Sequence, residues 1–431
     1  TTLHGLLLVR FDRLEQGKEV AQAGGVIGRE FSYELLRMVT SMDEPMLLGA
    51  LDQLVTSGLV FRRGTPPQAT FVFKHALIRD AAYGILLRQR RQTLHGTVAR
   101  SLEEYFPEMC EAQPELLAYH FREAGELIKA ISYLLAAAER ALSRSATSGA
   151  LAQLAQARDL ISTLPENTER LQLELKLEIT RGRALIAGRG YTAPETRECY
   201  WRARTLCDRL SDHHWLPLVL AGRSLSAWFA ADYKSAFESA QELIRWGERQ
   251  GVKPGRAIGH FLTGMTLTMM GDLPAARQHL ESSIDINEFA LPDRPPFLAS
   301  ELDGRIVTLM YLHTCLFVLG YPEQAKAAAE RALAEGPKQR YSMIVAQTNA
   351  CRMHALERDH QAVANVAQAA LQLSDEQGYP FFVGTSLVYR GWAMAQLGHP
   401  SEGIKLCRDG IAKLRSLDAM NWFPRYLAYL S

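Results

Sequence analysis

The sequence has almost no excess of charge of either sign. It contains 48 lysine and arginine residues against 47 aspartate and glutamate residues, which gives a formal net charge of +1 over 431 residues. This balance excludes a global electrostatic field that would draw the protein toward nucleic acid or an anionic membrane. The hydrophobic content of 47% is normal for a folded protein, and the length is sufficient for two or more folded units.

Cysteine is also scarce, and its spacing forms no recognisable motif. The six cysteines are scattered along the chain without a C-x-x-C pair; they are Cys110, Cys199, Cys207, Cys315, Cys351 and Cys407. Such scatter indicates buried thiols in a reducing compartment rather than a disulfide framework. We therefore expect a cytoplasmic protein.

Long hydrophobic runs and a leader sequence are missing as well. The most apolar uncharged stretch runs from Ile306 to Tyr321 and carries His313 and Thr314. It is short for a membrane span, so it predicts a buried helix and no association with a membrane. The first residues, from Thr1 onward, have neither the basic region nor the cleavage site of a signal peptide. Because an initiator methionine is absent, we expect the chain to be part of a longer protein.

The sequence has no recognisable catalytic or metal-binding signature. The glycine-rich segment 24–30 (GGVIGRE) lacks the Gly-Lys-Ser/Thr and the preceding strand of a phosphate-binding loop, and it predicts a turn between helices. Cys351, His354 and Glu357 are spaced by three, but no fourth ligand and no H-E-x-x-H accompany them, so we interpret them as polar residues of one helix. We expect no catalytic residues and no metal in this segment.

A spaced repeat is the strongest positive feature of the chain. A turn or small residue is followed five positions later by a small or apolar residue, and seven positions after that by another. The sets are Gly125/Ala130/Ala137, Ala231/Ala236/Leu243, Gly271/Ala276/Ser283, Gly320/Ala325/Ala332, Arg358/Val363/Ala370 and Gly398/Gly403/Gly410. The turn residues of the last four sets are 49, 38 and 40 residues apart, which indicates stacked pairs of antiparallel helices.

These repeats resemble the tetratricopeptide pattern. One repeat places its residues at that family's Gly, large, turn-Gly, Ala and large positions, namely Gly264, Leu267, Gly271, Ala276 and Leu280. The final repeat departs from the pattern because Gly403 stands where alanine is usual. The resemblance implies a concave groove, lined by the first helix of each pair, that binds a protein or peptide. The aromatic candidates for this groove are Trp228, Tyr233, Phe261, Tyr311, Phe317, Tyr389 and Trp392.

Residues 15–107 predict three helices followed by a β-hairpin, which is the arrangement of a winged helix. Lys18 to Ala23 is predicted as a helix that ends at Gly24-Gly25, and a charged and proline-containing first turn follows Asp43. The other expected elements are helices at 31–39 and 44–57, strands at 59–63 and 70–74, and a helix from 75 to 91 that continues to about 106.

This front part resembles the winged-helix region of bacterial STAND-type predicted ATPases. The resemblance lies in residues 26–36 (VIGREFSYELL), 51–60 (LDQLVTSGLV) and 71–83 (FVFKHALIRDAAY), and 190–195 (GYTAPE) resembles the start of a repeat in those proteins. It implies that residues 1–14 are the last helix of a missing upstream ATPase domain, that 15–107 are the winged helix and that 108–431 are the repeat solenoid. ATP or ADP and Mg would bind that upstream domain, and no cofactor would bind this segment.

Two local hypotheses follow for the winged helix. The helix at 44–57, which would enter a DNA groove, has no lysine or arginine, so we expect no nucleic-acid partner. By analogy with related signalling ATPases, His75 and Arg79 would sense the nucleotide state of the missing ATPase core. The alternative is that they are a helix-start histidine and a surface Arg/Asp pair.

The fold class expected from the sequence is mainly α, with a winged-helix domain followed by a tetratricopeptide-like α-solenoid. The expected function is that of a non-catalytic regulatory and protein–protein interaction region of a bacterial signalling ATPase. Three alternatives remain open: the sensor part of a STAND-type transcription regulator, the regulatory part of an adenylate or guanylate cyclase, and a plain adaptor scaffold if no ATPase precedes Thr1.

Overall fold

The computed structural model describes residues 10–11, 14–144, 146–211, 213–289, 304–334, 340–419 and 421–430. The chain divides into two compact units. The first unit comprises Thr1–Arg140 and Gln153–Leu164, and the second comprises Ala141–Ala152 and Pro165–Ser431. Most of the helix expected at 1–14 lies outside the described residues. The fold is mainly helical, as the sequence predicts.

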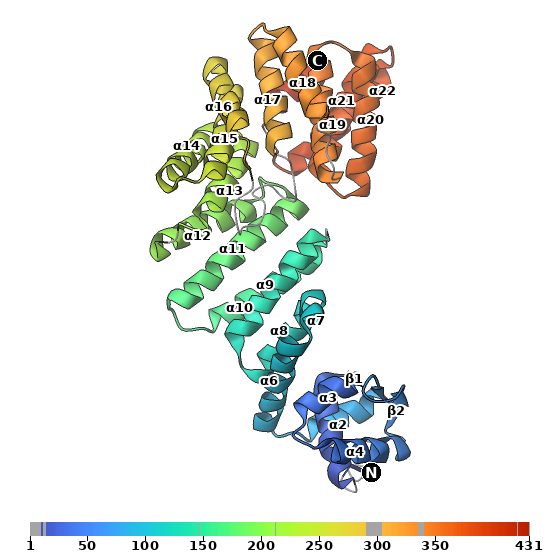
Figure 1. The fold of residues 1–431 in the computed structure, drawn as a ribbon. Helices are drawn as coiled ribbons and strands as arrows, with labels where there is room; N and C mark the ends of the chain where they lie inside the picture. Colours follow the sequence, from blue (N-terminus) through green and yellow to red (C-terminus); the bar gives the residue numbers. More distant parts are fainter. Residues whose placement is uncertain are drawn as a thin grey trace. The chain divides into compact units, whose positions relative to one another are not determined.

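The first unit begins with helices around a small antiparallel sheet (Figure 1). Its strand order is β1-β3-β2, and Phe31 of β1 and Arg62 of β2 both pair with Phe71 of β3. The elements are α2 (Glu15–Ile27), β1 (Glu30–Ser32), α3 (Tyr33–Val39), α4 (Glu44–Thr56), β2 (Val60–Arg63), β3 (Thr70–Phe73), α5 (Ala76–Gly84), α6 (Arg88–Tyr105), α7 (Pro107–Ala112), α8 (Pro114–Ala124) and α9 (Leu127–Ser143).

The sequence predicts most of these elements, with three errors. Helix α2 does not end at Gly24-Gly25 but continues to Ile27. The glycine at position 24 serves packing and not a turn, because a Cβ there would lie 2.7 Å from the Phe31 ring. Residues 30–32 form strand β1 instead of the start of a helix. The long helix expected from 75 to about 106 is interrupted between α5 and α6.

The first unit extends beyond Pro107, where the sequence places the domain boundary. Leu117 and Phe121 of α8 and Ala130 of α9 are buried in the same core as the N-terminal helices and strands. Those buried contacts hold α8 and α9 to the N-terminal part, so the first unit extends to Arg140.

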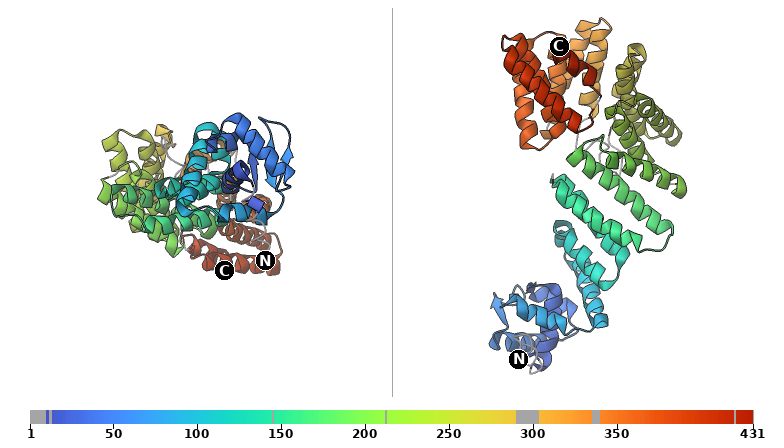
Figure 2. Two further views of the ribbon diagram at one scale, coloured as in Figure 1. Left: turned by 90° about the horizontal axis from the view of Figure 1, so that it is seen from below. Right: turned by 180° about the vertical axis from the view of Figure 1, so that it is seen from behind.

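The second unit is a series of antiparallel helix pairs (Figures 1 and 2). The sequence predicts no strand after Pro107, and the described part of the chain has none there. The helices that follow α9 are α10 (Thr147–Ser162), α11 (Thr168–Arg189), α12 (Pro194–Leu210), α13 (Leu216–Phe229), α14 (Tyr233–Gln250), α15 (Lys253–Met270), α16 (Leu273–Ile286), α17 (Gly304–Val318), α18 (Pro322–Ala334), α19 (Arg340–Leu356), α20 (His360–Glu376), α21 (Pro380–Gln396), α22 (Pro400–Ser416) and α23 (Phe423–Leu430).

The turn residues that define the repeat in the sequence share one backbone conformation. Their φ angles are all positive, at 84° for Gly125, 62° for Ala231, 86° for Gly271, 86° for Gly320, 60° for Arg358 and 98° for Gly398. This left-handed conformation ends the first helix of a pair and suits glycine. Ala231 and Arg358 adopt it despite their Cβ atoms, so the geometry of the repeat outweighs a local cost of about 1 kcal/mol.

Seven residues before the turn, the first helix of a pair comes close to a carbonyl of the second. Ser224 donates its hydroxyl to the Ala236 carbonyl at 2.9 Å, and His313 Nδ1 donates to the Ala325 carbonyl at 2.9 Å. In the last pair a glycine takes this position, and a Cβ at Gly391 would lie 2.5 Å from the Gly403 carbonyl oxygen. These three pairs therefore use either a polar contact or a small residue at this crossing.

This crossing explains why Gly403 departs from the tetratricopeptide pattern. A Cβ at Gly403 would lie 2.5 Å from the Gly391 carbonyl oxygen and 2.8 Å from the Ala395 backbone nitrogen. We expect Gly403→Ala, which restores the usual residue, to lower the free energy of unfolding by about 1 to 2 kcal/mol. Separating α21 from α22 costs more than the ~1 kcal/mol that alanine gains over glycine within a helix. Thermal unfolding followed by circular dichroism measures the difference.

Gly49 provides the matched control for that substitution. It lies inside α4, and a Cβ added there would meet nothing within 4 Å. Gly49→Ala should therefore gain stability, by up to about 1 kcal/mol. If Gly403→Ala were stabilising as well, the close approach of α21 and α22 would not be the reason for the glycine.

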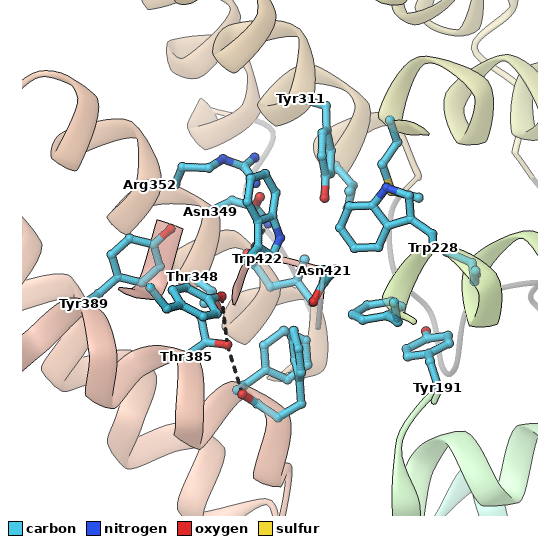
Figure 3. A pocket seen from close by; sticks show the side chains of 18 of the residues that line it. Tyr191, Trp228, Tyr311, Thr348, Asn349, Arg352, Thr385, Tyr389, Asn421 and Trp422 are labelled. Carbon is cyan, nitrogen blue, oxygen red and sulfur yellow. Dashed lines mark hydrogen bonds between the residues drawn. The ribbon is translucent and has the colours of Figure 1, made fainter. Parts of the chain in front are cut away.

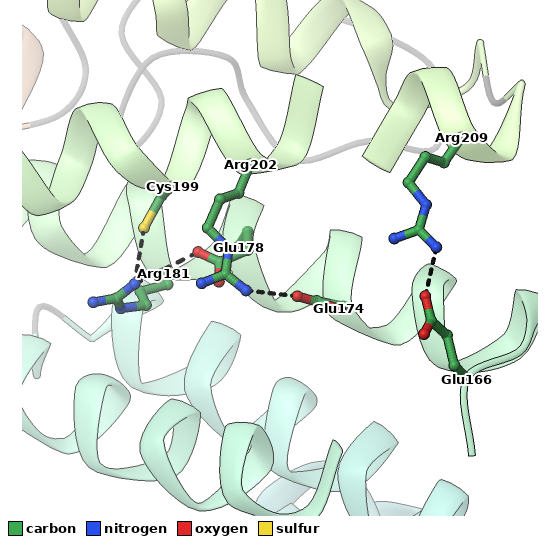
Figure 4. A network of polar contacts seen from close by, with 7 residues as sticks. All are labelled: Glu166, Glu174, Glu178, Arg181, Cys199, Arg202 and Arg209. Carbon is green, nitrogen blue, oxygen red and sulfur yellow. Dashed lines mark hydrogen bonds and ion pairs between the residues drawn. The ribbon is translucent and has the colours of Figure 1, made fainter. Parts of the chain in front are cut away.

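A network of ion pairs joins α11 to α12 (Figure 4). Glu178 is 1% exposed, and its carboxylate lies 3.5 Å from Arg181 and 3.6 Å from Arg202. Arg202 also pairs with Glu174 at 2.7 Å, while Arg209 and Glu166 meet at 2.6 Å. Because the charges of this cluster compensate each other, it serves as a structural link between the two helices.

Candidate functional site

The second unit contains a pocket lined mainly by aromatic side chains (Figure 3). The first helices of successive pairs, α13, α15, α17, α19 and α21, supply most of its lining. The loop before α12 supplies Tyr191, and α23 with the segment that leads into it supplies Asn421, Trp422 and Tyr426. Its free space is about 690 Å³, including the opening to solvent. We call it the inner-face pocket. Its lining residues are Tyr191, Leu225, Trp228, Phe229, Phe261, Met265, Val307, Tyr311, Val345, Thr348, Asn349, Arg352, Phe381, Phe382, Thr385, Tyr389, Asn421, Trp422 and Tyr426.

The end of the chain closes one side of this pocket. The Tyr233 hydroxyl donates to the backbone carbonyl of Asn421 at 2.9 Å, across 188 residues of sequence. The Thr192 hydroxyl donates to the carbonyl of Leu417, so that the loop before α12 meets the end of α22. These contacts bring Trp422 into the pocket beside residues that precede it by about half of the chain.

Contacts between rings hold the aromatic walls in place. Trp228 packs edge-on against Trp422, with ring centroids 6.1 Å apart, and against Tyr311 at 6.2 Å. Tyr191 and Phe229 stack with centroids 4.3 Å apart. Offset and edge-to-face arrangements of this kind are the favoured geometries for aromatic pairs. The walls are therefore a packed and largely preformed surface.

Arg352 provides the charge of the inner-face pocket. Its guanidinium carbon lies 4.7 Å from the Tyr311 ring and 5.0 Å from the Trp422 ring, and Figure 3 shows the side chain extending toward these rings. Its Nε donates to the Thr314 hydroxyl at 3.1 Å. Burial raises the pKa of Tyr311 and of Tyr389 above 10, so the phenols that surround Arg352 are neutral.

The aromatic residues proposed from the sequence divide into two groups. Trp228, Phe261, Tyr311 and Tyr389 line the inner-face pocket. The other residues contribute elsewhere: Tyr233 supports Asn421 from outside the lining, Phe317 lies near His313 with ring centroids 6.1 Å apart, and Trp392 stacks on Tyr429 at 4.8 Å.

The sequence did not predict Arg352 or the residues near the end of the chain as parts of the pocket. Arg352 lies six positions before the turn residue Arg358, where the Ala231 and Gly271 repeats have the pocket-lining residues Leu225 and Met265 and the Gly320 repeat has Thr314. Aligning the repeats on their turns therefore reveals an arginine at a position that is apolar and lines the pocket in two of the three preceding repeats. Asn421 and Trp422 belong to no repeat, so only the long-range contacts of the folded chain identify them.

His75 and Arg79 lie at the junction of β3 and α5. His75 is the exposed N-cap residue of α5, without a hydrogen bond from its side chain to the helix. Arg79 Nε donates to the Gly25 carbonyl at 3.2 Å, and its Nη1 pairs with Asp80 at 3.1 Å. The fold thus uses Arg79 to link α5 to α2 and leaves His75 accessible.

The thiols are protonated groups, most of them buried. Five of the six cysteines are buried, and burial raises the pKa of the Cys315 thiol to about 11 and that of Cys351 to about 12. Within the described ranges, no group of three or more His, Cys, Asp or Glu side chains is placed so that it could hold a metal ion. Nor does any helix within those ranges have both the length and the apolar character that a membrane span requires.

Comparison with known proteins shows the repeat fold without assigning a family. No family model matches the chain. An uncharacterized protein of Rhizobium meliloti (strain 1021) is 24% identical over 446 residues, which cover 99% of this chain and 42% of that protein. The chain therefore spans less than half the length of this relative.

Among solved structures, the apo quorum sensor NprR from B. thuringiensis has a TM-score of 0.52 at 10% identity, covering 88% of this chain and 97% of NprR. Apo RapI has a TM-score of 0.50 at 12% identity, covering 66% of this chain and 97% of RapI. A STAND protein with a tetratricopeptide repeat sensor from Pyrococcus horikoshii has a TM-score of 0.40 at 12% identity, covering 100% of this chain and 67% of that one. The chain has a tetratricopeptide-like helical-repeat fold.

Proposed function

We propose that the chain is the regulatory, ligand-sensing region of a bacterial STAND-type signalling ATPase. The observation that carries this proposal is the inner-face pocket, which five first helices and the end of the chain enclose together. The pocket has packed aromatic walls and few polar groups, a combination typical of recognition. A peptide or a segment of a protein is the effector that such a concave repeat surface suits.

The proposed mechanism couples binding to the arrangement of the repeats. A ligand in the inner-face pocket would contact α13, α19 and the residues before α23 at the same time. It would therefore stabilise the arrangement in which these segments meet, at the expense of any other. The N-terminal helices and hairpin, whose element order suits a winged helix, would pass this change to an ATPase core that binds ATP or ADP with Mg ahead of this chain.

His75 and Arg79 are the proposed point of contact with that nucleotide-binding core. His75 is exposed at a strand-to-helix junction, and Arg79 anchors the same helix to α2. An accessible imidazole on an anchored helix could respond to bound nucleotide, and α5 would carry that response into the first unit. This role belongs to the ATPase hypothesis and has no counterpart if the chain acts without such a core.

Selection of displayed peptides on the chain tests the sensing function. We expect the selected peptides to bind at least about tenfold more weakly to Phe382→Ala, which removes a partly exposed ring from the pocket. The matched control is Trp201→Ala, since Trp201 is 66% exposed on α12 and lies outside the pocket lining. Equal binding to both variants would place recognition elsewhere.

The same peptides test the relay in a protein that carries the ATPase core ahead of this chain. We expect a selected peptide to change the rate of ATP hydrolysis, and His75→Ala to abolish that change while the peptide still binds. An unaltered response in His75→Ala would exclude the proposed role of His75 and leave the sensing function in place.

A further inference from the structure

Arg352 lies inside the second unit with one nitrogen unused. The residue is 4% exposed, and its Nη2 has no hydrogen-bond partner. Among the described residues, no ion pair joins it to a carboxylate; its contacts include the Thr314 hydroxyl, the phenol and ring of Tyr311 and the ring of Trp422. A buried guanidinium without a counter-charge is costly, and ring contacts offset only part of the lost hydration. The position suits an anion that arrives from outside the chain.

Two further polar side chains of the pocket are buried and unpaired. Asn421 is 1% exposed, and both its Nδ2 and its Oδ1 lack partners. Trp228 is 2% exposed, and its Nε1 also lacks one. Buried polar groups are normally hydrogen-bonded, so three unsatisfied side chains in the lining of one pocket indicate a ligand that would complete their bonds. The amide and the indole add N–H donors to the guanidinium.

The charges around the pocket also favour an anion. None of the described lining residues is acidic. A second guanidinium, from Arg425, lies 4.8 Å from the ring of Trp422. The Tyr426 hydroxyl donates to Thr385, and burial raises the pKa of Tyr426, so this phenol adds no negative charge. The local potential is therefore positive, within walls that are otherwise apolar.

These features distinguish a carboxylate from a phosphate. The single lining guanidinium matches one carboxylate group, and the Asn421 amide and the Trp228 indole offer further N–H donors elsewhere in the lining. A phosphate dianion would place further oxygen atoms against aromatic rings, where they would lose hydration without gaining bonds. The aromatic walls beside Arg352 in turn match a flat, apolar group attached to the carboxylate.

We propose that the inner-face pocket binds a monocarboxylate with an adjoining aromatic or apolar group, whose carboxylate pairs with Arg352. This inference rests on the proposed sensing function and names the chemistry of its ligand. The C-terminal carboxylate of a peptide that ends in an apolar residue and a free aromatic acid share that chemistry.

Calorimetric titration of the chain with 3-phenylpropionate and with its neutral amide tests the proposal. We expect the acid to bind at least about tenfold more tightly than the amide, because only the acid pairs with the guanidinium. Equal affinities, or no binding of the acid at millimolar concentration, would overturn the proposal. This comparison uses the unaltered chain, so it does not depend on the folding of any variant.

Substitution of Arg352 then assigns the interaction to one residue. Arg352→Gln should lower the affinity for 3-phenylpropionate by about tenfold or more and remove the preference over the amide, whereas Arg352→Lys should retain part of that preference. Arg408→Gln, on the exposed face of α22, is the matched control and should bind as the unaltered chain does. An undiminished preference for the acid in a folded Arg352→Gln variant would contradict the assignment.

A peptide pair distinguishes the two sources of the carboxylate. The free acid and the C-terminal amide of acetyl-Ala-Ala-Leu-Phe present the same side chains. If the peptide acid binds more tightly than 3-phenylpropionate, a peptide terminus is the source, and the reverse order indicates a free acid. If peptides selected on the pocket bind equally well with free and amidated ends, the sensing function stands and the carboxylate inference fails.

Discussion

Replacement of Gly222 by alanine is expected to destabilise the second unit by about 3 kcal/mol. Gly222 lies on α13, where an added Cβ would be 2.2 Å from Cε1 and 2.4 Å from Cζ of Tyr200. The Tyr200 ring is only 2% exposed, and it cannot retreat because Gly182 of α11 bounds it on another side, with only 3.0 Å to an added Cβ there. The overlap must therefore separate α13 from α12.

Tryptophan fluorescence during denaturant unfolding measures this effect. All six tryptophans lie at position 201 or later, so their emission reports on the second unit. The change should appear as a lower denaturant midpoint with little change in the slope of the transition. An unchanged midpoint would mean that the helices tolerate the extra methyl group by a small shift.

A double-mutant cycle with Tyr200→Leu identifies the cause. Tyr200→Leu alone should also destabilise, because it leaves space in a packed core. If the ring is the group that the new methyl meets, the double variant should be more stable than the sum of the two changes predicts, by at least about 1 kcal/mol. Additive effects would instead indicate that Gly222→Ala acts through some other contact.

The turns and crossings of the repeats could be predicted from the sequence because they depend on local rules. A residue that ends one helix and starts the next must adopt the left-handed conformation, and a small residue must follow where the two helices cross. Two repeats meet both requirements within five residues, Gly271 with Ala276 and Gly320 with Ala325. The same logic identifies the less obvious turn at Arg358.

The pocket could be predicted only in part, because its remaining residues depend on contacts between distant segments. Trp228 and Tyr311 lie on first helices, so their repeat position is sufficient to place them. Asn421 and Trp422 reach the pocket because the end of the chain meets Tyr233, and no periodicity encodes that contact. Similarly, the sequence alone predicts a helix stop at Gly24, and only the fold places the Phe31 ring where a side chain at position 24 would be.

Acidification is expected to destabilise the first unit through a buried pair of histidines. Nδ1 of His95 on α6 lies 2.9 Å from Nδ1 of His120 on α8, and the Tyr83 hydroxyl lies 3.0 Å from Nε2 of His95. Two Nδ1 atoms can share one proton but cannot both carry one without losing the bond. Burial lowers the pKa of His95 to about 4 and that of His120 to about 3, from an ordinary value of 6.5.

The direction of the pH dependence follows from which state binds more protons. Below pH 6.5 the unfolded chain protonates both histidines, whereas the folded chain keeps them neutral until the pH approaches about 4. The free energy of unfolding is therefore undiminished by these histidines above pH 6.5, and it falls as the pH drops from 6.5 toward about 4. Each histidine lowers the free energy of unfolding by up to about 1.4 kcal/mol for every pH unit of acidification in this window.

Hydrogen exchange of α6 and α8 between pH 7 and pH 5, corrected for the intrinsic pH dependence of exchange, measures this loss. We expect the free energy of opening to fall by up to about 3 to 4 kcal/mol over that range.

The double variant His95→Gln/His120→Gln should be less stable at pH 7 but should lose much less stability on acidification. Leu94→Ala, which removes a buried neighbour on α6, should lower the stability by a similar amount at every pH, since it leaves the titrating pair in place. An acid response in the double variant as steep as in the unaltered chain would assign it to other groups, among which Glu123 and Arg91 act on His95 most directly.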